Sequence, residues 1–200
     1  MMQPMPRVPP FDRPATYEDL VKLPDHLVAE IVDGELHASP RPALWHSRAE
    51  SSLGRAIGGP YDDGIDGPGG WWILVEPELH LGRHVLVPDL AGWRRARMAE
   101  LPDAAYASLA PDWVCEVLSP STASFDRVKK LAVYAREAVA HVWFVDPALH
   151  TLEVLTLDGP RWVLAGSYAA NDVVRAEPFA EIGLELRRLW AGPADSTEQR

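Results

Sequence analysis

Short apolar segments alternate with glycine- and proline-rich breaks along most of the chain, a pattern typical of brief strands and helices. The clearest hairpin is predicted where residues 28–32 and 35–38 flank Asp33-Gly34, because this dipeptide favours the two-residue turn between antiparallel strands. The other strand segments are expected at 71–81, 85–89, 113–118, 141–145, 152–157 and 162–164, with 71–81 paired to 85–89.

Apolar residues at helical spacing predict three helices. A short one follows Thr16, a residue type that caps helix N-termini, and longer ones are expected at 45–57 and 126–136. Because the 126–136 helix joins strand 113–118 to strand 141–145, a right-handed crossover and a parallel strand pair are expected. The predicted fold class is therefore mixed α/β (α+β), with a mainly antiparallel central sheet flanked by helices.

Three regions are expected to contribute little to this sheet. Residues 58–70 are rich in glycine and predict a loop. Residues 93–109 are interrupted by Pro102 and predict a loop with a short helical turn. Residues 173–190 predict a peripheral strand or turn followed by a short segment.

Composition sets the expected domain organisation. The chain has 200 residues, 47% of them hydrophobic, which suits a single domain at 15–190 with one core. A proline-rich extended arm is expected at 1–14 and a polar tail at 191–200. No long apolar stretch indicates a signal peptide or membrane span, so a cytoplasmic protein is expected. The single cysteine, Cys115, is expected to be a buried structural thiol.

Two carboxylates stand out because each accompanies an apolar strand segment. Glu116 lies within the apolar segment 113–118, and Asp89 ends the apolar segment 85–88. On neighbouring strands the two groups would lie about 5 Å apart and repel each other by roughly 3 kcal/mol at an effective dielectric near 20. A bound cation would relieve that repulsion, and oxygen ligands favour Mg²⁺ first and Mn²⁺ second.

The order Pro-Asp, then Glu on the next strand, then a nearby Lys resembles the PD-(D/E)xK nuclease superfamily. The sequences of several individual segments resemble the Uma family of putative restriction endonucleases. The segments that carry this resemblance are 28–36, Ser39-Pro40 with His46, 87–90, 111–122, Asp126, 130–134 and 141–147. The resemblance implies a restriction-endonuclease-like core and a metal-dependent endonuclease that hydrolyses DNA phosphodiester bonds, acting as a homodimer.

The resemblance also implies roles for individual residues. Asp89 and Glu116 would hold the metal, with the Val117 carbonyl as an additional ligand. The strand lysine of the superfamily is absent, because position 118 is Leu, and Lys130 on the following helix takes its place. Glu30 would ligate a second metal or hold the lysine, although a carboxylate on a half-exposed strand edge fits its position equally well.

Further candidates surround this set. Glu78 is a possible additional ligand, although Pro77 obscures the strand register. Asp126 and Lys130 are also spaced as a simple helical ion pair. The possible substrate-binding residues are His46, Arg94, Arg95, Ser119, Ser121, Asp126, Lys129 and Tyr134.

The net charge of −10 argues against generic nucleic-acid binding, which needs a basic surface. Locally the balance reverses, since residues 83–97 contain four arginines against Asp89 alone. A catalytically inactive nuclease-like module that binds DNA or regulates a partner enzyme is therefore the alternative. A glycoside hydrolase built on a carboxylate pair is a third interpretation, but no spacing in the chain selects it.

Overall fold

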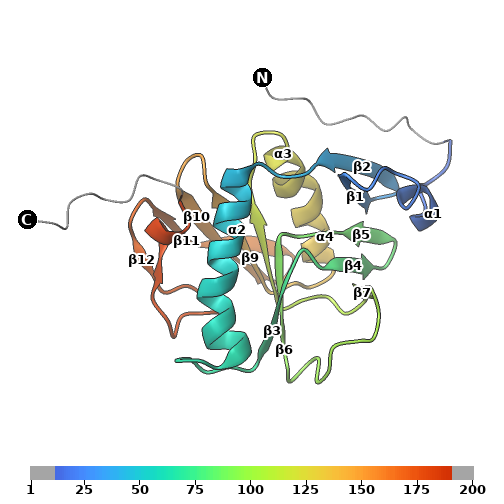
Figure 1. Ribbon diagram of the computed structural model, residues 1–200. Coiled ribbons are helices and arrows are strands. Elements are labelled where there is room, and N and C mark those ends of the chain that lie inside the picture. The colour runs from blue at the N-terminus through green and yellow to red at the C-terminus, as the bar shows by residue number, and fades with distance from the viewer. Residues whose placement is uncertain (1–11, 191–200) are drawn as a thin grey trace, which may run out of the picture.

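Two mixed sheets form the body of the protein, and a separate two-stranded sheet lies near the C-terminal end of the described chain (Figure 1). The computed structural model describes residues 12–190. The predicted arm at 1–14 therefore lies largely outside the described residues, and the tail at 191–200 lies wholly outside them. No helix in the described part of the chain is both long and apolar enough to cross a membrane.

The larger sheet has six strands and is mainly antiparallel, as predicted. Its order is β11 (Arg161–Ala169), β10 (Thr151–Asp158), β9 (His141–Asp146), β8 (Trp113–Val117), β6 (Leu90–Arg94) and β3 (Trp71–Val75). Only β8 and β9 run parallel within it. The connection between them is one helical stretch made of α3 (Ala123–Phe125), η2 (Asp126–Lys130) and α4 (Leu131–Arg136), which confirms the predicted parallel pair.

The smaller sheet has five strands and contains the predicted first hairpin. Its order is β2 (Glu35–Pro40), β1 (Leu27–Val32), β5 (His84–Leu86), β4 (Glu78–Leu81) and β7 (Tyr106–Ala107). Asp33 and Gly34 have φ angles of 51° and 82° between the paired residues Val32 and Glu35. These positive angles are those of the tight turn that the dipeptide favours. The short helix α1 (Tyr17–Leu20) precedes this hairpin, and the Thr16 N–H donates to the Asp19 carboxylate at 2.9 Å.

The predicted single strand at 71–81 is wrong, because the chain changes sheets in its middle. Glu76 has a φ of 46°, and Pro77 follows it, so the strand cannot continue. β3 pairs with β6, whereas β4 pairs with β5 in the other sheet. The predicted loop at 93–109 is also partly wrong, since its first residues belong to β6 and β7 lies near its end. The chain returns to the larger sheet at Asp89, whose carbonyl accepts the Glu76 N–H at 2.9 Å.

Helices cover both faces of the six-stranded sheet because β8 is apolar on both sides. Trp113, Cys115 and Val117 pack in the cluster that contains the inward residues of α2 (Leu44–Ile57). Val114 and Leu118 pack on the opposite face, in the cluster that contains residues of α4. This alternation follows from the two-residue period of a strand, and it turns Glu116 toward α4. Cys115 is fully buried, as expected of a structural thiol.

The predicted loop at 58–70 is wrong over its first half. The helical backbone of α2 continues through η1 (Gly58–Asp63), a π-helical segment in which Tyr61 is buried. Tyr61 packs against Phe179, with ring centroids 4.6 Å apart. The glycines of this segment therefore do not prevent helix formation, because tertiary packing compensates for their low helix propensity.

The C-terminal segment is part of the core, so its predicted peripheral position is wrong. It contains β12 (Val173–Val174), β13 (Leu184–Glu185) and the 3₁₀ helix η3 (Leu186–Arg188). Phe179 is 2% exposed and contacts the rings of Trp71, Trp113 and Trp143, with centroid distances of 5.0, 4.9 and 5.7 Å. One aromatic cluster thus joins the end of the chain to the centre of the sheet.

Replacing Phe179 by Ala is expected to lower the free energy of unfolding by about 3–5 kcal/mol, because it leaves a cavity among four aromatic rings. Urea unfolding followed by circular dichroism measures this change. Val173→Ala is the control, since Val173 is 67% exposed and its truncation should change stability by less than about 0.5 kcal/mol. Equal stability of Phe179→Ala and the wild type would contradict the core assignment.

Candidate active site

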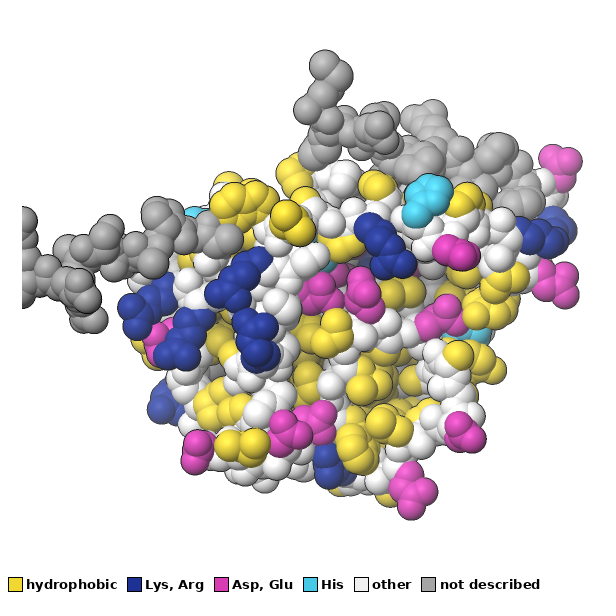
Figure 2. Space-filling view, viewed as in Figure 1, with side chains coloured by type: hydrophobic (Ala, Val, Ile, Leu, Met, Phe, Trp, Pro, Cys, Tyr) yellow, Lys and Arg dark blue, Asp and Glu magenta, His cyan; other side chains and the backbone are white. Residues whose placement is uncertain are grey.

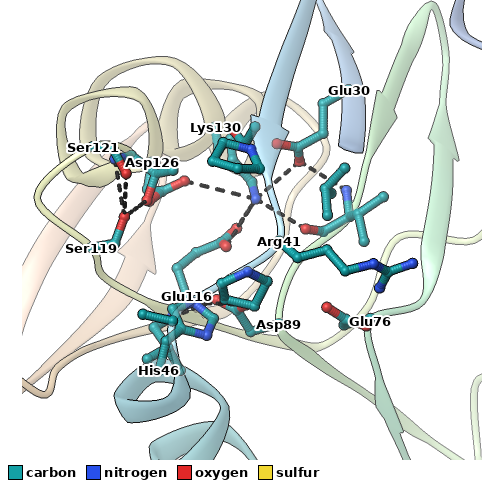
Figure 3. A pocket seen from close by; sticks show the side chains of 18 residues that line it. Glu30, Arg41, His46, Glu76, Asp89, Glu116, Ser119, Ser121, Asp126 and Lys130 are labelled. Carbon is teal, nitrogen blue, oxygen red and sulfur yellow. Dashed lines mark hydrogen bonds and ion pairs between the residues drawn. The ribbon is translucent and has the colours of Figure 1, made fainter. Parts of the chain in front are cut away.

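A cavity of about 280 Å³ lies where the two sheets meet. Figure 3 shows its acidic and basic side chains pointing inward from β1, the start of α2, the end of β8 and the helical stretch after β8. Its polar and charged lining residues are Glu30, Ser39, Arg41, His46, Glu76, Asp89, Glu116, Ser119, Ser121, Thr122, Asp126 and Lys130. Most of the residues predicted from the sequence therefore share one cavity.

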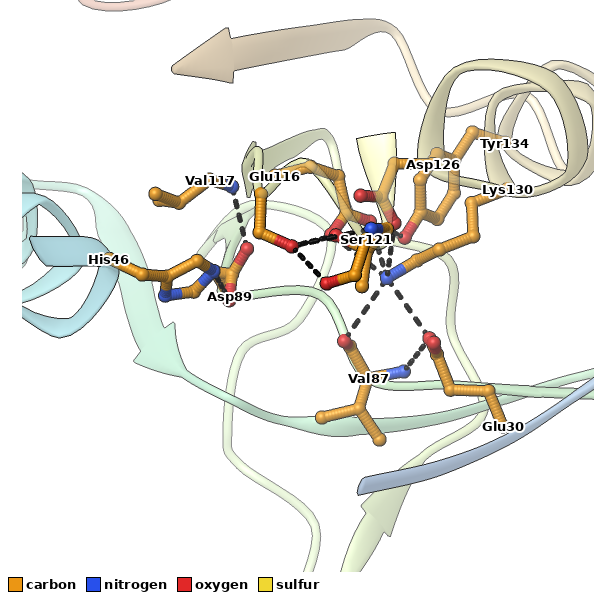
Figure 4. Close-up of polar contacts among 12 residues, drawn as sticks. Glu30, His46, Val87, Asp89, Glu116, Val117, Ser121, Asp126, Lys130 and Tyr134 are labelled. Atoms are coloured by element: carbon orange, nitrogen blue, oxygen red, sulfur yellow. Dashed lines mark hydrogen bonds and ion pairs between the residues drawn. The ribbon is translucent and has the colours of Figure 1, made fainter. Parts of the chain in front are cut away.

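Lys130 lies at the centre of the polar contacts and is 2% exposed (Figure 4). Its Nζ atom lies 2.8 Å from Glu116 and 3.0 Å from Glu30, and it donates to the Val87 carbonyl at 3.2 Å. Asp126, one helical turn before it, is 3.8 Å away. Lys130 therefore contacts both sheets and its own helix at once.

The charges around Lys130 shift the pKa values of this group. Burial alone would lower the pKa of Lys130, but Glu116 and Glu30 outweigh burial and raise it, so the ammonium stays charged. Burial raises the pKa of Asp126 to about 6, although Lys130 opposes this shift. The Tyr134 hydroxyl donates to Glu116, so the two oxygens of that carboxylate have Lys130 and Tyr134 as partners. Glu30 also accepts the Val87 N–H at 2.8 Å.

Asp89 lies beside this cluster but contacts the other helix. One of its oxygens accepts the Val117 N–H at 2.6 Å, and the other lies 3.1 Å from Nε2 of His46 on α2. Burial would lower the pKa of His46, but the hydrogen bond and charge of Asp89 outweigh it and raise that pKa. Asp89 and Glu116 thus line one cavity while their closest side-chain contacts come from helices on opposite faces of the sheet.

Glu50, which sequence reasoning missed, lies close to His46 and Asp89 but lines a neighbouring cavity, which shares Glu76 with the first. Ligand atoms of His46, Glu50 and Asp89 lie within 4.8 Å of one another, as in sites that hold a metal ion. Glu50 is 6% exposed, and burial together with Asp89 and Glu76 raises its pKa to about 7. Among the described residues, Glu50 Oε1 and His46 Nδ1 are buried without a hydrogen-bond partner. Buried polar atoms of this kind are rare in proteins and fit a cation that is held nearby.

The structure separates several predicted substrate-binding residues from the cavity. Arg94 and Arg95 lie at the far end of β6, about 16 Å along the strand from Asp89 at ~3.3 Å per residue. The Arg94 guanidinium lies over the Trp71 ring, and Arg95 pairs with Asp62 at 2.8 Å. Lys129 lies 3.8 Å from Glu35 at the surface.

Glu78, the predicted additional ligand, also lies elsewhere. It lines a different cavity, and its Oε1 atom is 2.7 Å from Nε2 of His80. Ser119 and Ser121 line the main cavity and contact each other through their hydroxyls at 2.9 Å.

The protein is thus a mixed α+β domain with an acidic cavity and a buried lysine where its two sheets meet. The chain belongs to the Uma2 family, described as "Putative restriction endonuclease", whose model matches residues 14–188. Among solved structures, it is similar to "a putative nuclease belonging to DUF820" from Anabaena variabilis ATCC 29413, with 23% sequence identity and a TM-score of 0.69. That match covers 88% of this chain and 97% of the other, which confirms the fold class. No curated protein matches the chain.

Replacing Lys130 by Met is expected to destabilise the protein by about 3–5 kcal/mol at pH 8, because it leaves buried carboxylates without a cation. The folded variant would then bind more protons than its unfolded chain, since burial raises carboxyl pKa values above those of the unfolded state. Its stability loss should therefore shrink as the pH falls from 8 to 5. Urea unfolding at both pH values measures this difference.

Lys129→Met is the control for this experiment, because Lys129 neighbours Lys130 in sequence but is exposed at the surface. It should change stability by less than about 0.5 kcal/mol at either pH. A stability loss in Lys130→Met that does not depend on pH would contradict the account of the buried charges.

Proposed function

We propose that the protein is a metal-dependent endonuclease that hydrolyses phosphodiester bonds of DNA. The observation that carries this proposal is the convergence of two groups at one cavity. Asp89 and His46 line this cavity and, together with Glu50 of a neighbouring one, offer a set of metal ligands, and Lys130 supplies a fixed positive charge beside Glu116. Membership of a family of restriction-endonuclease-like proteins supports the same reaction class.

The donor atoms of the site suit a hard divalent cation. Asp89, Glu50 and Glu116 provide carboxylate oxygens, which favour Mg²⁺ or Mn²⁺, and the His46 nitrogen increases the fit to Mn²⁺. The Val117 carbonyl is a further candidate ligand, since the Val117 backbone contacts His46. When bound, such a cation would acidify a water molecule and neutralise charge on the reacting phosphate.

The residues of the chain would divide the remaining work. Lys130 would attract and orient a phosphate oxygen as a cation, because its raised pKa makes it a poor base at neutral pH. Glu116, Glu30 and the Val87 carbonyl would fix the position of the ammonium. Tyr134 would keep Glu116 in place through its hydroxyl. A preorganised charge of this kind stabilises a transition state without reorganisation during the reaction.

One observation favours a second candidate function, DNA binding without cleavage. Glu116 is held by Lys130 and Tyr134, so it can join a metal only if one of these contacts loosens. A chain in which these contacts persist would bind nucleic acid and regulate a partner without hydrolysis. Cleavage of plasmid DNA in the presence of Mg²⁺ or Mn²⁺ distinguishes this candidate from the endonuclease.

Asp89→Ala and Glu116→Ala are each expected to reduce metal-dependent cleavage of plasmid DNA by at least about 100-fold, since each removes a carboxylate proposed to hold the metal ion. Gel assays with Mg²⁺ and Mn²⁺ measure this loss, and circular dichroism confirms that the variants fold. Glu78→Gln is the control, because Glu78 lines another cavity, and it should retain wild-type cleavage. Wild-type cleavage by either alanine variant would contradict the catalytic role proposed for that carboxylate.

Glu50→Gln is expected to weaken Mn²⁺ binding about tenfold or more, the loss typical even for a residue that only supports a metal ligand. Isothermal titration calorimetry of the DNA-free protein with MnCl₂ measures the affinity. The Glu78→Gln protein should bind Mn²⁺ like the wild type. Unchanged affinity in Glu50→Gln would show that Glu50 is not a metal ligand.

A further inference from the structure

Most cations of the described chain have a partner carboxylate within 4.0 Å. The paired residues are Arg13, Arg83, Arg95, Arg97, Arg127, Lys129, Lys130, Arg136, Arg187 and Arg188. Three arginines close together in sequence, Arg41, Arg48 and Arg55, form no such ion pair with any described residue. In a protein with a net charge of −10, these three guanidinium groups are thus left without a direct ion pair to any described carboxylate.

The positions of these arginines relate them to the cavity. Arg41 lines it and lies near Glu76 at its mouth (Figure 3). Arg48 and Arg55 are exposed on α2 and share one stripe of the helix, because they are seven residues apart. Both guanidinium groups donate to the Ser52 hydroxyl between them. His46 and Glu50 lie on the buried side of α2, nearly opposite this exposed stripe, and belong to the metal-ligand group, so one helix carries both features.

We infer that Arg41, Arg48 and Arg55 form a track that binds the phosphate backbone of DNA and leads it to the cavity, an inference that rests on the proposed endonuclease function. Each arginine can make a charge-assisted hydrogen bond to a phosphate, and the shared Ser52 hydroxyl limits the freedom of Arg48 and Arg55. An uncompensated guanidinium attracts phosphate more strongly than one that must first leave a carboxylate.

The spacing of the track fits a nucleic-acid strand. The backbones of Arg48 and Arg55 are about 10 Å apart along the helix axis at 1.5 Å per residue, but their guanidinium groups converge on the one Ser52 hydroxyl and lie close together. A strand of B-form DNA rises about 3.4 Å per nucleotide, so the two guanidinium groups are matched to two adjacent phosphates. Arg41 then extends the track toward the catalytic residues at the cavity.

The C-terminal segment adds further positive charge on the side of the molecule that carries the track. Leu186 of η3 and the following Leu189 belong to the same core cluster as Ala49 and Leu53 of α2. Arg187 and Arg188 are exposed there and share the single carboxylate of Glu185, which leaves excess positive charge. Figure 2 shows Lys and Arg side chains gathered next to α2 and over β12, beside a hollow that holds acidic side chains. The acidic net charge of the chain is therefore compatible with DNA binding on this face.

The test compares duplex DNA binding by the wild type and by Arg48→Ala/Arg55→Ala. Fluorescence anisotropy of a labelled duplex, measured with Ca²⁺ as the only divalent cation, reports affinity across a series of salt concentrations. The double variant should bind roughly tenfold more weakly near 0.1 M salt, and its slope of log affinity against log salt should be less steep by about 1.8, as expected for two lost phosphate contacts. Arg41 is left unchanged because it lines the cavity.

Two further variants separate charge from other effects. Arg161→Ala removes an exposed arginine on β11 that also lacks an ion pair among the described residues, and it should bind DNA like the wild type. Arg48→Lys/Arg55→Lys keeps both charges and should keep most of the salt slope.

The outcomes distinguish this inference from the proposed function. Metal-dependent cleavage by the wild type, with unchanged affinity and slope in the Arg48→Ala/Arg55→Ala protein, overturns the track alone. An equal loss in Arg161→Ala does the same, because it would show that any arginine on the surface contributes. A wild-type protein that neither binds nor cleaves DNA overturns both.

Discussion

The site depends on one buried ammonium that is held by acceptors from different parts of the chain. An unpaired buried charge costs several kcal/mol, so Lys130 keeps Glu30 of β1, the Val87 carbonyl and Glu116 of β8 in fixed positions. The buried carboxylates need a cation, and the lysine that provides it lies on the helical stretch after β8 and not on the strand itself. Position 118, just after β8, is a leucine that is 3% exposed and packs in the core, so it supplies no cation to the site. The helix after β8 therefore supplies the cation from outside the sheet.

Local patterns predicted the elements whose structure is determined locally. The Asp33-Gly34 turn, the helix at 44–57 and the parallel pair of β8 and β9 follow from turn chemistry, periodicity and connection length. The change of sheet at Glu76 was not predicted, because Pro77 signals an irregularity in the strand but does not show that the two halves pair in different sheets. The C-terminal segment was misplaced because its strands are short, and Phe179 is buried by rings that are distant in sequence.

The candidate site was predicted to the extent that a family motif specifies it. The motif order indicated Asp89, Glu116 and Lys130, and all three line one cavity. Glu50 was missed because a glutamate in a helix usually faces solvent, yet it follows His46 by four residues and adjoins the buried Ala49. Arg94 was linked to Asp89 by closeness in sequence, but β6 is extended and carries it to the other end of the sheet.

The chain crosses from the larger sheet to the smaller one at Glu76 and crosses back at Asp89, and a backbone hydrogen bond joins these two points. Lys130 bridges the same seam, with Glu30 and Val87 on one side and Glu116 on the other. The ammonium therefore links the two sheets across the seam at the cavity. Any rotation of one sheet against the other would stretch the contacts of Lys130 and reshape the cavity, so the geometry of the reacting groups is tied to the relative orientation of the two sheets.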